Sequence, residues 1–121
     1  HMAFSNINFK FNGIEEAKLL VDVVEQRFNT LQKMVPDGAV VVCEVEFERV
    51  SAHQNGRIYR VETNLSIDGR LYRAEATENT FEEAIAKIRD ELDYELSRAK
   101  DKQYTLHKRA GRALKKLLSR S

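Results

Sequence analysis

Residues 59–76 read YRVETNLSIDGRLYRAEA, and this stretch decides the fold class. On either side of Asp68-Gly69, apolar and polar residues alternate with the period of a half-buried β-strand. An Asp-Gly pair between two such runs is typical of a two-residue type I′ turn, because both turn residues need a positive φ. The stretch therefore predicts an antiparallel hairpin. The small Ala74 and Ala76 on its inward face would let a helix approach closely.

Two more strands are predicted upstream of this hairpin. Ile7, Phe9 and Phe11 alternate with polar residues and stop at Asn12-Gly13. Residues 39–50 alternate again, and their inward side holds Val41, Cys43, Val45 and Phe47. The opposite side holds Glu44, Glu46 and Glu48, for which an acidic solvent face is a commoner explanation than a carboxylate site. Residues 51–57 contain Asn55-Gly56 and are expected to form a loop.

Two helices are predicted from apolar residues that recur at spacings of three and four. The first runs from Ile14 to Val35 and is ended by Pro36-Asp37-Gly38. The second begins after Asn79-Thr80, where Glu82 and Glu83 complete two overlapping capping boxes. The order β-α-β-β-β-α defines an α+β domain in which two helices cover one face of a four-stranded sheet. A length of 121 residues fits one such domain.

The second helix is expected to run without a break from Phe81 to Leu117. At 1.5 Å per residue it would be roughly 55 Å long, whereas a ten-residue strand reaches only ~33 Å. About 20 Å of helix should then project past the sheet, with an apolar seam that includes Leu106, Ala110, Ala113 and Leu117. The alternative is a helix that breaks near Gln103 and folds back or frays, since Gly111 weakens it by about 1 kcal/mol.

Charge is strongly segregated along the chain, although its net value is only +1. Residues 1–95 hold 11 Lys and Arg against 18 Asp and Glu, whereas residues 96–121 hold 9 against the single Asp101. Clustered cations favour binding to a phosphate backbone, because binding releases the counterions condensed on it. The alternative is a solvated helix face. We therefore divide the chain into a body (3–102) and a basic helical extension (103–121), and we regard His1-Met2 (1–2) as a cloning remnant.

Catalytic motifs are not evident in this sequence. Glycine-rich phosphate loops do not occur, and the single Cys43 falls on an inward strand face between glutamates. His53 and His107 lack nearby metal ligands or an orienting carboxylate, so both are expected at the surface. We therefore predict no enzyme, cofactor, metal or small-molecule substrate. The one Cys and the absence of a ~20-residue apolar run favour a cytoplasmic protein without a membrane span.

The segment from Val61 to Phe81 resembles the third and fourth strands of ribosome hibernation-promoting factors, also called ribosome-associated inhibitors or sigma-modulation proteins. Shared features are a turn with Gly, a strand that contains Arg-Ala-Glu, and an acidic residue shortly before the aromatic residue that begins the last helix. Residues 27–33, RFNTLQK, look like the end of that family's first helix. The resemblance covers about residues 5–102 and points to a short-form member, without the further C-terminal domain that dimerises ribosomes.

The resemblance implies a non-catalytic factor that binds the small ribosomal subunit in the channel for messenger and transfer RNA and so silences idle ribosomes. By position, the family's RNA-contacting cations correspond here to Arg27, Lys33, Arg98, Lys100 and Lys102. Two positions depart from the pattern, because Glu91 and Tyr94 stand where cations are expected. This shifts the positive charge toward the C-terminus, where the candidate RNA-binding residues are Lys108, Arg109, Arg112, Lys115 and Lys116.

An alternative function is a non-ribosomal oligomerisation or protein-interaction module built on the long helix. Its four-three apolar spacing suits a coiled-coil contact, including a homodimer through the C-terminal helix. If RNA is the partner, we expect recognition through shape and phosphate, because Tyr104 is the one aromatic residue in the basic segment. We also expect the cations of the two helices to lie on one edge of the domain.

Overall fold

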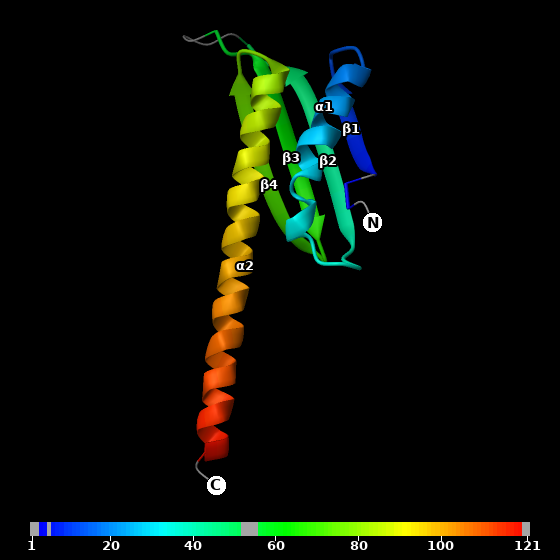
Figure 1. Ribbon diagram of the computed structural model, residues 1–121. Helices are drawn as coiled ribbons and strands as arrows, with labels where there is room; N and C mark the ends of the chain where they lie inside the picture. The colour runs from blue at the N-terminus through cyan, green and yellow to red at the C-terminus, as the bar shows by residue number, and fades with distance from the viewer. Residues whose placement is uncertain (1–2, 5, 52–55, 120–121) are drawn as a thin grey trace.

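In the computed structural model, two helices lie on one face of a four-stranded sheet (Figure 1). The structure describes residues 3–4, 6–51 and 56–119, so the proposed cloning remnant and the expected surface His53 lie outside the described residues. The sheet has the order β1 (Ile7–Asn12), β2 (Val41–Arg49), β3 (Tyr59–Ile67) and β4 (Arg70–Glu78). β1 is parallel to β2 and the other neighbours are antiparallel. The predicted α+β order is confirmed.

The Asp68-Gly69 hairpin is confirmed in its backbone geometry. Asp68 has φ 49° and Gly69 has φ 84°, the positive values that this turn requires. The Asp68 carboxylate oxygen Oδ1 also accepts the backbone N–H of Val40 at 2.8 Å, and the Asp68 N–H donates to the Val40 carbonyl at 2.9 Å. The hairpin tip is thereby attached to the start of β2, at the end of the sheet where α2 leaves the domain (Figure 1).

The core lies between the inner sheet face and the helices. Its strand residues follow the predicted alternation, and the fully buried ones are Val45, Phe47, Val61, Thr63 and Leu65. Cys43, Ala74 and Ala76 are buried as expected, and α2 packs against β4 and β3. Phe4 is a core residue that the sequence pattern did not identify. Its ring lies 5.9 Å from that of Phe28, edge to face.

The first helix is shorter than predicted. It is α1 (Lys18–Asn29), followed by a short 3-10 helix η1 (Gln32–Met34), rather than one helix from Ile14 to Val35. The end of α1 has 3-10 geometry because the backbone N–H groups of Thr30 and Leu31 donate to carbonyls three residues back. The Thr30 hydroxyl also donates to the Arg27 carbonyl at 2.7 Å. Leu31 and Val35 remain buried, so the apolar stripe was predicted correctly although its helical continuity was wrong.

The second helix, α2 (Phe81–Ser119), is continuous over 39 residues. Its start is capped by Thr80, whose Oγ1 accepts the Glu83 N–H at 3.1 Å. A break near Gln103 is therefore wrong. Leu96 is the last buried residue of α2, and residues 100–119 are all exposed. We call residues 103–119 the overhang, which projects past the sheet as a straight rod (Figure 1). None of the described helices could span a membrane.

Candidate nucleic-acid interface

The two halves of α2 carry opposite charge. Residues 81–95 hold six Asp and Glu against Lys87 and Arg89, whereas residues 98–119 hold eight Lys and Arg against Asp101 alone. The acidic half is the part that packs on the sheet, and the basic half begins where the helix leaves it. A single continuous helix therefore carries eight of the 20 Lys and Arg residues away from the acidic body.

A groove lies at the base of the overhang, between η1, the β3–β4 hairpin and α2. We call it the basal groove. It has a volume of about 480 Å³ and brings Lys33 and Lys100 together, from helices far apart in the sequence. Arg70, at the start of β4, lines the same groove. Two predicted cations, Lys33 of η1 and Lys100 of α2, therefore line the same groove, together with Arg70, which was not predicted.

A second hollow adjoins the basal groove on the other flank of α2. Its lining includes Arg98 and Lys102, and it shares Arg70 with the basal groove. Arg98 is tethered by an ion pair with Glu95 at 3.7 Å, and its guanidinium carbon lies 5.7 Å from the centroid of the Tyr94 ring. Four of the five cations that the family resemblance selects therefore line two neighbouring hollows.

Arg70 was missed by sequence reasoning. Its position directly after the Asp68-Gly69 turn was the available signal, because a hairpin tip exposes the first residue of the following strand. What could not be foreseen was that this tip lies beside the point where α2 leaves the sheet. That proximity is a tertiary feature, which depends on the order of the strands and the path of α2.

Arg27 stands apart from the other candidate cations. It is exposed in the last turn of α1 and lines neither the basal groove nor the hollow beside it. Arg89 of α2 lies close to this helix end, because its Nε donates to the Thr30 hydroxyl at 2.8 Å. Arg89 is also paired with Asp90 and Asp93, so its charge is largely compensated within the protein.

The cations of the overhang are exposed to solvent. They are Lys108, Arg109, Arg112, Lys115 and Lys116. Within the described part of the chain, none of these five makes an ion pair. Uncompensated cations on a solvent-exposed helix are available to bind an external anion. Glu91 and Tyr94, at the positions where the resemblance leads one to expect cations, are likewise exposed on α2.

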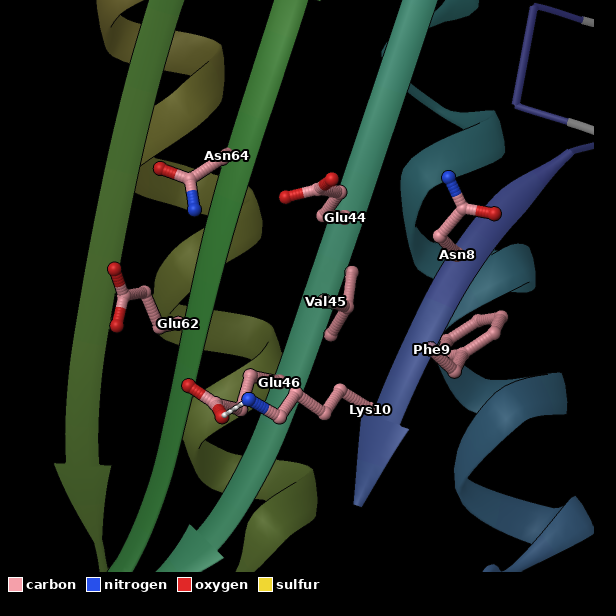
Figure 2. A pocket seen from close by; sticks show the side chains of 8 residues that line it. All are labelled: Asn8, Phe9, Lys10, Glu44, Val45, Glu46, Glu62 and Asn64. Carbon is pink, nitrogen blue, oxygen red and sulfur yellow. Dashed lines mark ion pairs between the residues drawn. The ribbon is translucent and has the colours of Figure 1, made fainter. Parts of the chain in front are cut away.

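The opposite, helix-free face of the sheet carries a dense network of ion pairs. A hollow on this face has a volume of about 300 Å³. Figure 2 shows the ion pair at this hollow between Lys10 of β1 and Glu46 of β2; the paired atoms are 3.4 Å apart. Arg60 of β3 pairs with glutamates from three strands, which are Glu48, Glu62 and Glu75. Hydrogen bonds from Arg60 and Arg73 lower the pKa of Glu62. The predicted acidic solvent face is confirmed, and its carboxylates are mostly neutralised internally.

Two further residue predictions are confirmed by burial. Cys43 is a core residue, and burial, with a smaller contribution from Glu44, raises the pKa of its thiol to about 12. A thiol with so high a pKa is a poor nucleophile near neutral pH. His107 is exposed on the overhang. Among the described residues, no group of three His, Cys, Asp or Glu side chains is arranged to hold a metal ion.

Solved structures with this fold include two from bacteria. The N-terminal domain of Protein Y from Thermus thermophilus superposes with a TM-score of 0.63 at 19% identity, covering 75% of this chain and 93% of that one. A ribosomal subunit interface protein from Coxiella burnetii superposes with a TM-score of 0.63 at 18% identity, covering 78% and 97%. Identities this low establish similarity of fold alone. Among curated protein sequences, none matches this chain.

The family relationship is established by sequence. Residues 7–104, from the start of β1 to just beyond the basal groove, match the family model described as Sigma 54 modulation protein / S30EA ribosomal protein. The match spans most of the chain and all seven secondary-structure elements except the distal part of α2. The chain therefore belongs to the Sigma 54 modulation protein / S30EA ribosomal protein family.

Proposed function

We propose that this chain is a cytoplasmic hibernation factor that binds the small ribosomal subunit in the channel for messenger and transfer RNA and so inhibits translation. Its family description includes a ribosomal protein, and one protein of the same fold is named a ribosomal subunit interface protein. The role is binding, without a reaction, cofactor or small-molecule substrate. The observation that carries the proposal is the basic half of α2, with eight cations against one carboxylate.

The proposed RNA contacts use the helices rather than the sheet. The open sheet face is a poor candidate because its cations are already paired with glutamates. The candidate contacts are Arg27, Lys33, Arg98, Lys100, Lys102, Lys108, Arg109, Arg112, Lys115 and Lys116. Residues 3–102 would position the protein on the subunit, and the extension 103–121 would follow the phosphate backbone. Such binding is driven by counterion release and is weakened by salt.

The test is co-sedimentation with isolated small ribosomal subunits over a series of salt concentrations. The triple variant Arg98→Gln, Lys100→Gln, Lys102→Gln should bind more weakly and should lower the salt slope by about one unit for each phosphate-binding cation removed. The matched control Lys10→Gln, Lys18→Gln, Lys87→Gln removes the same charge from positions outside both basal hollows. A slope unchanged in the first variant would remove these cations from the mechanism, and absence of binding at low salt would overturn the proposal.

A second candidate function is self-association through the overhang. Leu106, Leu114, Leu117 and Leu118 are each more than half exposed there. Two antiparallel overhangs could pair these leucines, with the small Ala110 and Ala113 near the centre. Because each overhang carries five cations, like-charge repulsion should make this dimer stronger as salt rises. Sedimentation of the free protein at two salt concentrations separates the two functions, since RNA binding has the opposite salt dependence.

A further inference from the structure

The basal groove carries an excess of positive charge. Lys33, Arg70 and Lys100 reach it from η1, β4 and α2, and none of the three is ion-paired within the described part of the chain. Asp68 is the one carboxylate among the described residues that line the groove, and its Oδ1 already accepts the Val40 N–H. Three uncompensated cations around one hollow favour an anionic ligand.

The same groove has an apolar floor. Met34, Ile67 and Tyr72 line it and are each half-buried, with the buried Leu96 beneath them. The guanidinium carbon of Arg70 lies 5.4 Å from the centroid of the Tyr72 ring, so a planar cation rests over an aromatic face. Guanidinium planes and aromatic rings are the surfaces on which unstacked nucleobases pack in protein–RNA complexes.

These two features together narrow the class of ligand. An inorganic anion would engage the cations and leave the apolar floor exposed to water. A purely apolar ligand would leave three cations without partners, at the cost of their partial desolvation. A ligand with a planar, largely apolar part and a phosphate satisfies both. The volume of about 480 Å³ lies within the usual range for small-molecule sites.

We propose that the basal groove binds one unstacked nucleotide, with its base on the surface formed by Arg70 and Tyr72 and its phosphate between Lys33 and Lys100. The nucleotide belongs either to a single-stranded RNA segment or to the pool of free nucleotides, which present the same chemistry. For the RNA source the proposal rests on the proposed function and adds a base contact to phosphate binding. Stacking tolerates every base, so the contact does not require sequence specificity.

The experiment titrates the full chain with three small probes, followed by the chemical shifts of its backbone amides. Adenosine 5′-monophosphate should bind at least about fivefold more tightly than adenosine, which lacks phosphate, or ribose 5-phosphate, which lacks the base. The largest changes in chemical shift should occur in residues 33–35, 67–72 and 96–103. A short single-stranded RNA with one 2-aminopurine is the fourth probe, because stacking of that base in the groove quenches its fluorescence.

Variants test which residues contact the phosphate of the ligand and which contact its base. Lys33→Gln with Lys100→Gln should weaken monophosphate binding about tenfold. Arg70→Lys keeps the positive charge but removes the planar guanidinium group. It should therefore weaken the binding of adenosine monophosphate and abolish fluorescence quenching of the RNA probe, while the affinity for ribose 5-phosphate stays the same. The matched control Lys10→Gln with Lys18→Gln removes two exposed cations from other parts of the surface. It should change neither the affinity for any probe nor the quenching of the RNA probe. All of these side chains are exposed, so folding should be preserved.

The outcomes separate this proposal from the proposed function. Binding of free monophosphate without quenching of the RNA probe identifies a free nucleotide as the ligand, and quenching identifies RNA. If the monophosphate binds no better than ribose 5-phosphate and the RNA probe is not quenched, the nucleotide site is overturned. Co-sedimentation with ribosomal subunits could still hold in that case. Conversely, a nucleotide site that persists when co-sedimentation fails would leave this inference standing for free nucleotides.

Discussion

At the scale of single residues, Cys43 couples the stability of the domain to alkaline pH. Burial holds the pKa of its thiol at about 12, above the ordinary value of 9.0. Between these two values the unfolded chain loses the thiol proton while the folded chain keeps it. The free energy of unfolding must therefore fall as pH rises, by about 1.4 kcal/mol per pH unit from this group.

We predict that unfolding in urea will show this slope between about pH 9 and pH 10.5 for the native chain but not for Cys43→Ala. The variant should be less stable near neutral pH because it leaves a small cavity, and the difference should shrink as pH rises because only the native chain loses the contribution of the thiol. Titrating lysines and tyrosines are common to both proteins, so their effects cancel in the comparison. Parallel stability curves would mean that the folded protein already releases the thiol proton at the ordinary pKa.

Residue patterns identified most of the core but not every cation that lines the basal groove. Cys43 and Ala74 were placed inside because strand alternation reports burial directly. Phe4 was missed because a single aromatic residue before the first strand has no period, and only its contact with Phe28 shows its role. Arg70 was missed because its partners Lys33 and Lys100 come from other elements.

At the scale of elements, the α2 helix was predictable and the end of α1 was not. The four-three spacing and the Thr80 cap identify α2, and no Pro interrupts it. In contrast, an α-helix followed by a 3-10 turn preserves nearly the same apolar spacing, so Leu31 and Val35 could not reveal where α1 ends. Periodicity reports which side of a segment is buried, whereas its hydrogen-bond pattern sets the boundary.

The same Gly→Ala substitution should act in opposite directions in two elements. Gly111 lies in the exposed helix of the overhang, and an added Cβ would meet no atom within 4 Å. Gly111→Ala should stabilise that helix by about 1 kcal/mol and slow amide hydrogen exchange there about fivefold. Gly69 has φ 84°, so Gly69→Ala should destabilise the hairpin by about 1 kcal/mol in urea unfolding. A gain of stability in Gly69→Ala would contradict the positive φ of this turn.

At the scale of the whole molecule, folding and RNA binding should be separable. All the buried apolar residues of the described chain lie between Phe4 and Leu96, whereas all the described cations beyond Lys102 lie on exposed helix. A helix without tertiary contacts is held by its own propensity and by continuity with the packed half of α2. The overhang should therefore contribute charge to binding but little to the stability of the body.

A chain ending at Lys102 tests this separation. Its free energy of unfolding should lie within about 1 kcal/mol of that of the full chain, because the truncation removes no buried side chain of the described structure. Its salt slope for RNA should fall by up to about six units, since the five cations of the overhang and Arg120 are removed. Urea unfolding and RNA binding at several salt concentrations measure the two quantities. A large drop in stability would make the overhang part of the folding unit, and an unchanged salt slope would mean that its cations do not touch RNA.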